Sequence, residues 1–246
     1  MTHTTLTVDG PVGELHLVVS DPPRVIDRGR TLFLLHGLPL SRDGAATASR
    51  LLPELAERVA QEAGWQAVAV SLRGVGGSQG SFSASGWLDD LGVVLDAQLG
   101  DRRGYSIAGF GLGGAIALRQ AAKDERARGI VALATPSKID RWCGEASSFL
   151  KACKHAGVIG AHDDIDPEAL RDDVIALDPC GAMASLPPRR ILVVHGSVDT
   201  RVPESSARDL VDAAHGHAEL RIIQGAGHGL RADPRMVATL LGWLDR

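Results

Sequence analysis

Short apolar runs alternate with helical patterns along most of the chain, and this alternation limits the possible folds more than any other feature. Strands are expected at residues 4–8, 14–19, 31–35, 66–70, 104–108, 129–134, 190–194 and 219–223. Apolar residues at three- and four-residue spacing predict helices at 46–63, 85–99, 112–123, 204–214 and 234–244. Such alternation builds a sheet covered by helices on both faces. The expected fold class is therefore α/β, with an eight-stranded, mostly parallel sheet flanked by helices.

The length of the chain suits one large domain. It has 246 residues, 44% of them hydrophobic, which is enough for a substantial core. Only the turn DGPVG separates the first two strands, so we expect them to form an antiparallel hairpin at one edge of the sheet. One long insertion interrupts the alternation between the strands at 129–134 and 190–194, with helical stretches near 141–155 and 166–176. Such insertions often select substrates.

Composition argues for a small-molecule substrate or ligand as the partner. The net charge is −4 and there is no long basic run, so nothing favours nucleic acid or an anionic membrane surface. No apolar run approaches the length of a membrane span, and the first residues do not resemble a signal peptide. The three cysteines, Cys143, Cys153 and Cys180, lack C-x-x-C spacing and suit reduced thiols. We therefore expect a cytoplasmic protein, while its oligomeric state stays open.

An acidic run, HDDID, precedes Pro167 and raises the question of a metal site. Asp166 stands directly before that proline, the arrangement typical of a helix N-cap. The capping interpretation is the simpler one, so the sequence predicts neither a metal site nor a cofactor.

The stretch YSIAGFGLGG supports two incompatible interpretations. Gly109, Gly111 and Gly114 spell the G-x-G-x-x-G of a dinucleotide-binding turn, whereas Gly109 and Gly113 frame a G-x-S-x-G nucleophile elbow with Gly111 in place of serine. A dinucleotide turn normally follows the first strand of its sheet and needs an acidic residue about 20 positions later. Here four expected strands come first and the next strand ends without Asp or Glu. The pattern therefore favours the elbow.

The elbow interpretation requires an acid and then a histidine after later strands. Asp199 lies just past the strand at 190–194, and His228 lies in a glycine-rich loop after the last strand. After an early strand comes His36-Gly37-Leu38, where the backbone N–H of Leu38 can form one side of an oxyanion hole. The N–H of Leu112, directly after the elbow, would form the other side.

Five motifs follow one another in the order known from one superfamily. They are HGLP at 36–39, RGVGGS at 73–78, GFGLGG at 109–114, HGSVDTRVP at 195–203 and GAGH at 225–228. Together they make the chain resemble the α/β-hydrolase superfamily. The resemblance implies that Asp199 is the triad acid, that His228 is the triad base and that Leu38 and Leu112 are the oxyanion donors. It also implies one hydrolase domain over 1–246, in which the insertion 137–187 is a small helical cap.

Gly111 removes the hydroxyl through which a serine hydrolase forms its acyl-enzyme. A base, its orienting acid and an oxyanion hole remain, and such remnants still give roughly 10³–10⁴-fold catalysis over water. His228 would then act as general base on water or on the substrate, a small ester, thioester or amide. A lyase or cyclase on the same frame, a ligand-binding protein without chemistry and a serine esterase engineered to glycine at 111 stay open as alternatives.

Other hydroxyl or thiol groups are weaker candidates for the nucleophile. Cys143 lies in the expected cap, and Thr135 and Ser137 follow the strand after the elbow. A buried cysteine is usually inert. For the substrate pocket, the cap offers an apolar lining with three candidates: Trp142, Phe149 and Leu150. His36 and His195 are expected to be structural.

Overall fold

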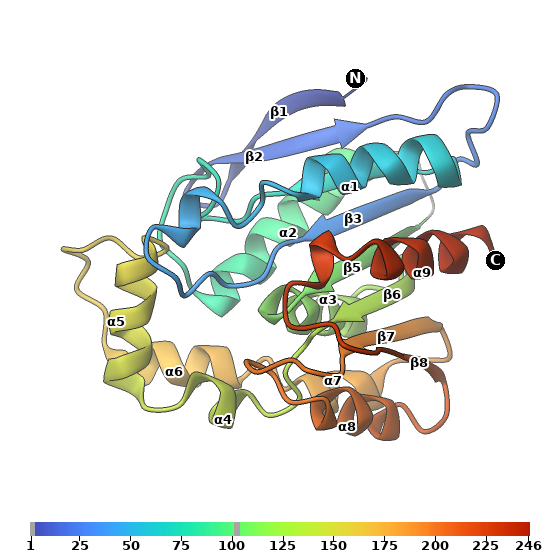
Figure 1. Ribbon diagram of the computed structural model, residues 1–246. Helices are drawn as coiled ribbons and strands as arrows, with labels where there is room; N and C mark the ends of the chain where they lie inside the picture. The colour runs from blue at the N-terminus through green and yellow to red at the C-terminus, as the bar shows by residue number, and fades with distance from the viewer. Residues whose placement is uncertain (1–2, 101–103) are drawn as a thin grey trace.

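The computed structural model describes residues 3–100 and 104–246. In these residues one sheet of eight strands runs in the order β1-β2-β4-β3-β5-β6-β7-β8 (Figure 1). The strands are β1 (His3–Gly10), β2 (Gly13–Ser20), β3 (Thr31–Leu35), β4 (Gln66–Val70), β5 (Tyr105–Phe110), β6 (Ala127–Leu133), β7 (Arg190–Gly196) and β8 (Ala218–Ile223). The pairs β1–β2 and β2–β4 are antiparallel, and all other neighbouring pairs are parallel. The predicted fold class and the predicted edge hairpin are both confirmed.

Helices cover both faces of the sheet. The described helices and helical turns are η1 (Gly44–Ala46), α1 (Leu52–Arg58), η2 (Val59–Ala63), α2 (Ala84–Leu99), α3 (Leu112–Lys123), α4 (Ile139–Cys143), α5 (Ala146–Ala156), α6 (Pro167–Ile175), α7 (Pro179–Ser185), α8 (Ser205–Ala213), η3 (Leu230–Ala232) and α9 (Pro234–Asp245). Apolar residues of α1, η2 and α9 form one core cluster with the sheet, and those of α2, α3 and α8 form the other.

Strand β3 shows how the sheet separates these two clusters. Leu32 and Leu34 belong to the cluster with α1 and α9, whereas Phe33 and Leu35 belong to the cluster with α2 and α3. Successive side chains of a strand point to opposite faces, so a strand buried on both faces is apolar throughout. This is why TLFLL is a continuous apolar run rather than an alternating one.

Two helix predictions were wrong in their extent. The helix expected at 46–63 begins only at Leu52 and ends in the π-helical turn η2, because Pro53 fits only the first turn of a helix. The helix expected at 141–155 is divided into α4 and α5 at Gly144, whose φ is 68°. Glu145 then caps α5 by accepting hydrogen bonds from the next residues. The short helix α7 was not predicted at all.

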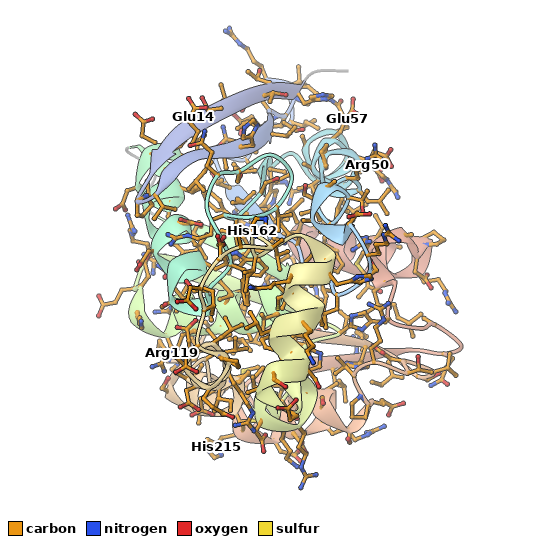
Figure 2. All side chains as sticks on the ribbon, turned by 90° about the vertical axis from the view of Figure 1, so that its left-hand side faces the viewer. Glu14, Arg50, Glu57, Arg119, His162 and His215 are labelled. Carbon is orange, nitrogen blue, oxygen red and sulfur yellow. The ribbon has the colours of Figure 1, made fainter. Side chains whose placement is uncertain are left out.

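The insertion 137–187 holds four helices that differ in their surroundings. Helix α7 packs against α3 and α8 and so belongs to the layer of helices on the sheet. Helices α5 and α6 pack against each other, and α5 lies beyond the carboxyl ends of the parallel strands (Figure 1). Figure 2 faces that end of the sheet, with α5 in front and His162 labelled in the loop that follows it. Two backbone hydrogen bonds, Phe82 N–H to Val158 O at 2.8 Å and Asp43 N–H to His155 O at 3.2 Å, connect this region to loops of the main domain.

The acidic run before α6 has the capping role predicted for it. The Asp166 side chain accepts a hydrogen bond from the backbone N–H of Glu168 at 3.0 Å, and Pro167 is the first helical residue. In the described residues there is no group of three or more His, Cys, Asp or Glu side chains able to hold a metal ion. Within the same residues, no helix is long and apolar enough to cross a bilayer.

Candidate functional site

The centre of the site is the sharp turn between β5 and α3. Gly111 stands at this turn with φ 53° and ψ −122°, a backbone conformation that non-glycine residues adopt only under strain. Its N–H donates to Leu133 O at 2.8 Å, and its carbonyl accepts from the N–H of Gly114 at 3.0 Å. The turn therefore has the geometry of a nucleophile elbow, with glycine at its apex.

The glycines of this turn differ in the space around them. A Cβ added to Gly109 would overlap the backbone of Gly113, and one added to Gly113 would overlap the carbonyl oxygen of His36. A Cβ added to Gly111 would instead lie in ordinary van der Waals contact, 3.7 Å from Nε2 of His228. The flanking glycines are thus required by close packing, whereas the position of Gly111 has room for a side chain that faces His228.

Asp199 and His228 form a hydrogen-bonded pair at the carboxyl ends of β7 and β8. Nδ1 of His228 lies 2.8 Å from Oδ2 of Asp199, and the other oxygen, Oδ1, accepts from the N–H groups of Arg201 at 2.8 Å and Val202 at 3.0 Å. Burial acts to raise the pKa of the Asp199 carboxyl, but these hydrogen bonds outweigh it and hold the pKa below its ordinary value. The carboxylate is therefore ionised and directs the free Nε2 of His228 toward Gly111.

The two backbone N–H groups predicted as oxyanion donors belong to Leu38 and Leu112, on the loop after β3 and at the start of α3. In the part of the chain that the structure describes, the N–H of Leu38 makes no hydrogen bond to the protein. Leu112 is the first residue of α3, where the N–H groups have no partner within the helix. A Cβ added to Gly37 would come within 2.9 Å of Phe110 O, so the backbone before Leu38 passes directly against the elbow.

His36 is a structural residue behind this loop. Its Nδ1–H donates to Gly37 O at 3.0 Å, and its Nε2 accepts from the N–H of Leu72 at 3.0 Å. The ring is buried and makes an edge contact with Trp87, with centroids 5.0 Å apart. Burial lowers the pKa of His36 to about 4, so the ring is neutral near pH 7 and keeps both hydrogen bonds.

His195 supports the loop that carries the acid. Its Nε2 donates to Val202 O at 2.9 Å and lies 3.5 Å from Oδ2 of Asp199. The whole side chain is buried, and its Nδ1 has no hydrogen-bond partner among the described residues. Its contacts are to the acid-bearing loop, as expected for a structural histidine.

The RGVGGS turn is held by a buried ion pair. Arg73 donates to Asp90 at 2.6 Å, and the Arg73 carbonyl accepts from the indole N–H of Trp87 at 3.0 Å. Within the same turn, Gly76 N–H donates to Ala45 O at 3.0 Å. The turn therefore supports the loop at 44–48 through a backbone hydrogen bond.

A cavity of about 320 Å³ opens in front of these groups. Its walls bring together Gly111, His228 and Leu38 with Phe110 and the loop from Pro39 to Ala48. Two further residues, Arg201 and Arg231, line the same cavity. Sequence reasoning did not identify these arginines, although each follows a predicted triad residue by two or three positions.

The alternative nucleophiles lie elsewhere. Ser137 donates to Asp209 at 2.8 Å, and the buried Thr135 hydroxyl faces Leu133 O at 3.5 Å. Burial raises the pKa of the Cys143 thiol, which makes it a poorer nucleophile. None of the three lines the cavity in front of His228.

The apolar residues proposed for the substrate pocket also have other neighbours. Trp142 and Phe149 make an edge contact with each other, with centroids 5.9 Å apart, and Leu150 packs against the core. Trp142 lines a separate small cavity beside Arg201 and Asp209. The cavity at His228 has no lining residue from the insertion 137–187.

Comparison with known proteins establishes the family. The model of the α/β hydrolase fold matches residues 30–152, which is half of the chain and includes the elbow. The chain belongs to the α/β-hydrolase family. At the level of this superfamily it is a protein of hydrolase type. A search of curated proteins found no match.

Solved structures share the fold over nearly the whole chain. An α/β serine hydrolase without lid from Xanthomonas campestris is 24% identical, with a TM-score of 0.66 over 99% of this chain and 92% of that one. A serine hydrolase homologue from Coxiella burnetii is 22% identical, with a TM-score of 0.67 over 100% and 97%. An esterase from Pyrococcus furiosus is 16% identical, with a TM-score of 0.70 over 99% and 92%. At these identities the likeness concerns the fold alone.

Proposed function

We propose that this α/β-hydrolase family member hydrolyses a small carbonyl substrate without a covalent intermediate, with His228 as the general base. The observation that carries the proposal is the different surroundings of the two ring nitrogens of His228. Nδ1 is bound to Asp199 at 2.8 Å, while Nε2 faces the open position at Gly111, 3.7 Å from where a Cβ would be. Glycine leaves room of about the size of one water molecule, roughly 30 Å³, at that point.

The reaction needs only groups at this site and water. Nε2 of His228 takes a proton from a water molecule while the water oxygen bonds to the carbonyl carbon of the substrate. The carbonyl π bond breaks, and the resulting oxyanion accepts hydrogen bonds from the N–H groups of Leu38 and Leu112. When this intermediate collapses, the bond to the leaving group breaks and the His228 imidazolium returns the proton to it. The products are a carboxylic acid and an alcohol, thiol or amine.

Asp199 supports the base in two ways. Its hydrogen bond keeps the proton of neutral His228 on Nδ1, so that Nε2 has a free lone pair, and its charge stabilises the imidazolium that forms.

A cavity of about 320 Å³ is at the small end of the range for ligand sites. We therefore propose a small ester, thioester or amide as the substrate. The free thiols of Cys143, Cys153 and Cys180 fit a reducing compartment such as the cytoplasm.

A protein that binds a ligand without turning it over is the second candidate. The absence of a hydroxyl at Gly111 favours it, because the acyl-enzyme route of serine hydrolases is closed there. Proton abstraction from the substrate itself by His228 would give a lyase or cyclase instead. A serine esterase engineered to glycine at this position would be a trap for its substrate.

The parent chain and two variants separate these possibilities. The parent chain, Gly111→Ser and His228→Ala are compared on a panel of activated esters and thioesters, together with labelling by a fluorophosphonate probe. We expect slow turnover by the parent without labelling, loss of that turnover in His228→Ala, and labelling of Gly111→Ser. His217→Ala removes an exposed histidine that directly precedes β8, and it serves as the matched control.

Each other outcome favours a different function. Unchanged turnover in His228→Ala would contradict the proposal. Turnover only in Gly111→Ser would mean that the site is complete except for its nucleophile, as in an engineered trap. Ligand binding without turnover in both the parent chain and Gly111→Ser over a long incubation would favour the ligand-binding protein.

A further inference from the structure

Two arginines from different loops meet at the cavity of the proposed active site. Arg201 lies in the loop after β7, and Arg231 lies in the helical turn η3 after β8. Both line the cavity that contains Gly111 and His228. The two loops are the ones that carry the acid and the base, so the positions of the arginines are coupled to the position of His228.

Neither arginine side chain has a carboxylate partner within residues 3–100 and 104–246. Many other arginines of the chain form ion pairs with Asp or Glu, namely Arg28, Arg42, Arg58, Arg73, Arg126, Arg208, Arg221, Arg235 and Arg246. The nearest acid in sequence to Arg231, Asp233, is occupied by Arg235 at 2.6 Å. The nearest acid to Arg201, Asp199, is bound to His228 and to backbone N–H groups.

The cavity therefore has an unbalanced positive charge in a chain whose net charge is −4. Its lining includes no Asp or Glu among the described residues, and its charged groups are the two arginines. Arg231 is half-buried and Arg201 is exposed, and burial together with the neighbouring charge of Arg201 lowers the pKa of Arg231. An anion bound between the two like charges would offset their mutual repulsion.

We infer that Arg201 and Arg231 form an anion subsite of this cavity, and that the natural substrate carries an acidic group beside its reactive carbonyl. The inference rests on the proposed function for the location of the reaction, but not for the binding of the anion. Guanidinium groups bind oxyanions in a planar, often bidentate geometry, which suits a carboxylate or a phosphate. The cavity volume limits the ligand to a short acid, such as the monoester or monothioester of a small dicarboxylic acid.

The subsite also assigns an orientation to the substrate. Arg201 and Arg231 line the same cavity as His228 and Gly111, so an anion bound to them would occupy part of this cavity. The carbonyl group is then left to face Gly111 and the oxyanion donors. Negatively charged substrates would be attracted into the cavity, and neutral ones would bind without a preferred direction.

Binding measurements test the subsite without any need for turnover. Succinate, inorganic phosphate and the neutral succinamide are titrated into the ¹⁵N-labelled parent chain while the amide signals of Leu38, Gly111 and Gly229 are followed. We expect the anions to shift these signals and succinamide to leave them in place. Arg201→Gln and Arg231→Gln should each weaken anion binding roughly 10- to 100-fold, the range for a charged hydrogen bond, and Arg24→Gln, on an exposed turn, should not change it.

Succinate and phosphate distinguish the two possible acidic groups of the substrate, a carboxylate and a phosphate. The anion that binds more tightly identifies which of the two groups the subsite prefers. Equal shifts with succinamide and succinate, or anion binding that survives in the double variant Arg201→Gln, Arg231→Gln, would overturn the subsite. If the parent hydrolyses esters, the ratio of kcat/KM for monoethyl succinate to that for diethyl succinate should also fall in both arginine variants. Anion binding without hydrolysis would leave the subsite intact and count only against the proposed reaction.

Discussion

The elbow at Gly111 and the loops that carry Asp199 and His228 are built in different ways. The elbow is held by close packing of backbone against backbone, for example Gly113 against the carbonyl oxygen of His36. The acid–base loops are held by hydrogen bonds to side chains, as in the contacts of Asp199 with His228 and with two backbone N–H groups.

This difference explains why the nucleophile position can change alone. The shape of the elbow depends on residues that flank Gly111, and a Cβ placed at the apex would meet nothing closer than ordinary van der Waals distance. A side chain at this position would therefore add little packing to the turn. Loss of the Asp199 side chain would instead leave three donors without their acceptor. Variants in the two regions should therefore differ in their cost.

The largest effect is expected for Gly113→Ala in the elbow. The new Cβ would overlap the backbone at His36, which cannot move without displacing β3, so we expect a loss of at least about 3 kcal/mol in the free energy of unfolding. Urea unfolding followed by circular dichroism measures it. Gly92→Ala in α2, where nothing lies within 4 Å of the new Cβ, is the control and should stabilise the chain slightly. Equal stabilities would contradict the packing argument.

Acid should weaken the packing behind the elbow through His36. Its pKa is lowered from 6.5 to about 4 in the folded chain, so between these values the unfolded chain binds the proton more readily. The contribution of His36 is intact above pH 6.5, and about 3 kcal/mol is lost as the pH falls from 6.5 to 4. The measurement is the free energy of unfolding against pH for the parent and for His36→Leu. Parallel pH profiles would show that His36 does not titrate in this way.

A smaller effect is expected for Asp199→Ala in the acid–base loops. The N–H groups of Arg201 and Val202 and the Nδ1 of His228 lose their acceptor, but one of these hydrogen bonds is exposed and the other two are only part-buried, so the expected cost is about 2 kcal/mol. Thermal or urea unfolding reports this change, and Asp212→Ala at an exposed position of α8 is the control. A cost as large as that of Gly113→Ala would erase the contrast between the two regions.

The smallest effect is expected for Gly111→Ala at the apex of the elbow. Backbone strain at φ 53° costs roughly 1–3 kcal/mol, and the reduced freedom of the unfolded chain returns roughly 0.4–1 kcal/mol. The net loss should be about 1 kcal/mol by urea unfolding, well below that of Gly113→Ala. A loss above that of Gly113→Ala would mean that the apex is packed as tightly as its flanks.

Errors in the predicted elements came from residues whose conformation depends on distant contacts. Local signals were enough for the strands, because an apolar run bounded by turn residues is read within a few positions. The stretch before Leu52 has apolar residues at helical spacing, yet it forms turns that bond to α5 and to the turn at Gly76. Helix α7 is only seven residues long and is stabilised by α3 and α8, which lie far from it in sequence.

The sequence by itself determined the fold class, the edge hairpin, the family and the missing hydroxyl at Gly111, because each of these depends on local patterns and on the order of motifs. Tertiary structure alone decided which flanking glycines are fixed by packing, and that Arg201 and Arg231 reach one cavity without carboxylate partners. Charge on an arginine is visible in a sequence. Whether that charge is neutralised depends on which loops meet, and this is settled only when the strands that carry those loops are paired in the sheet.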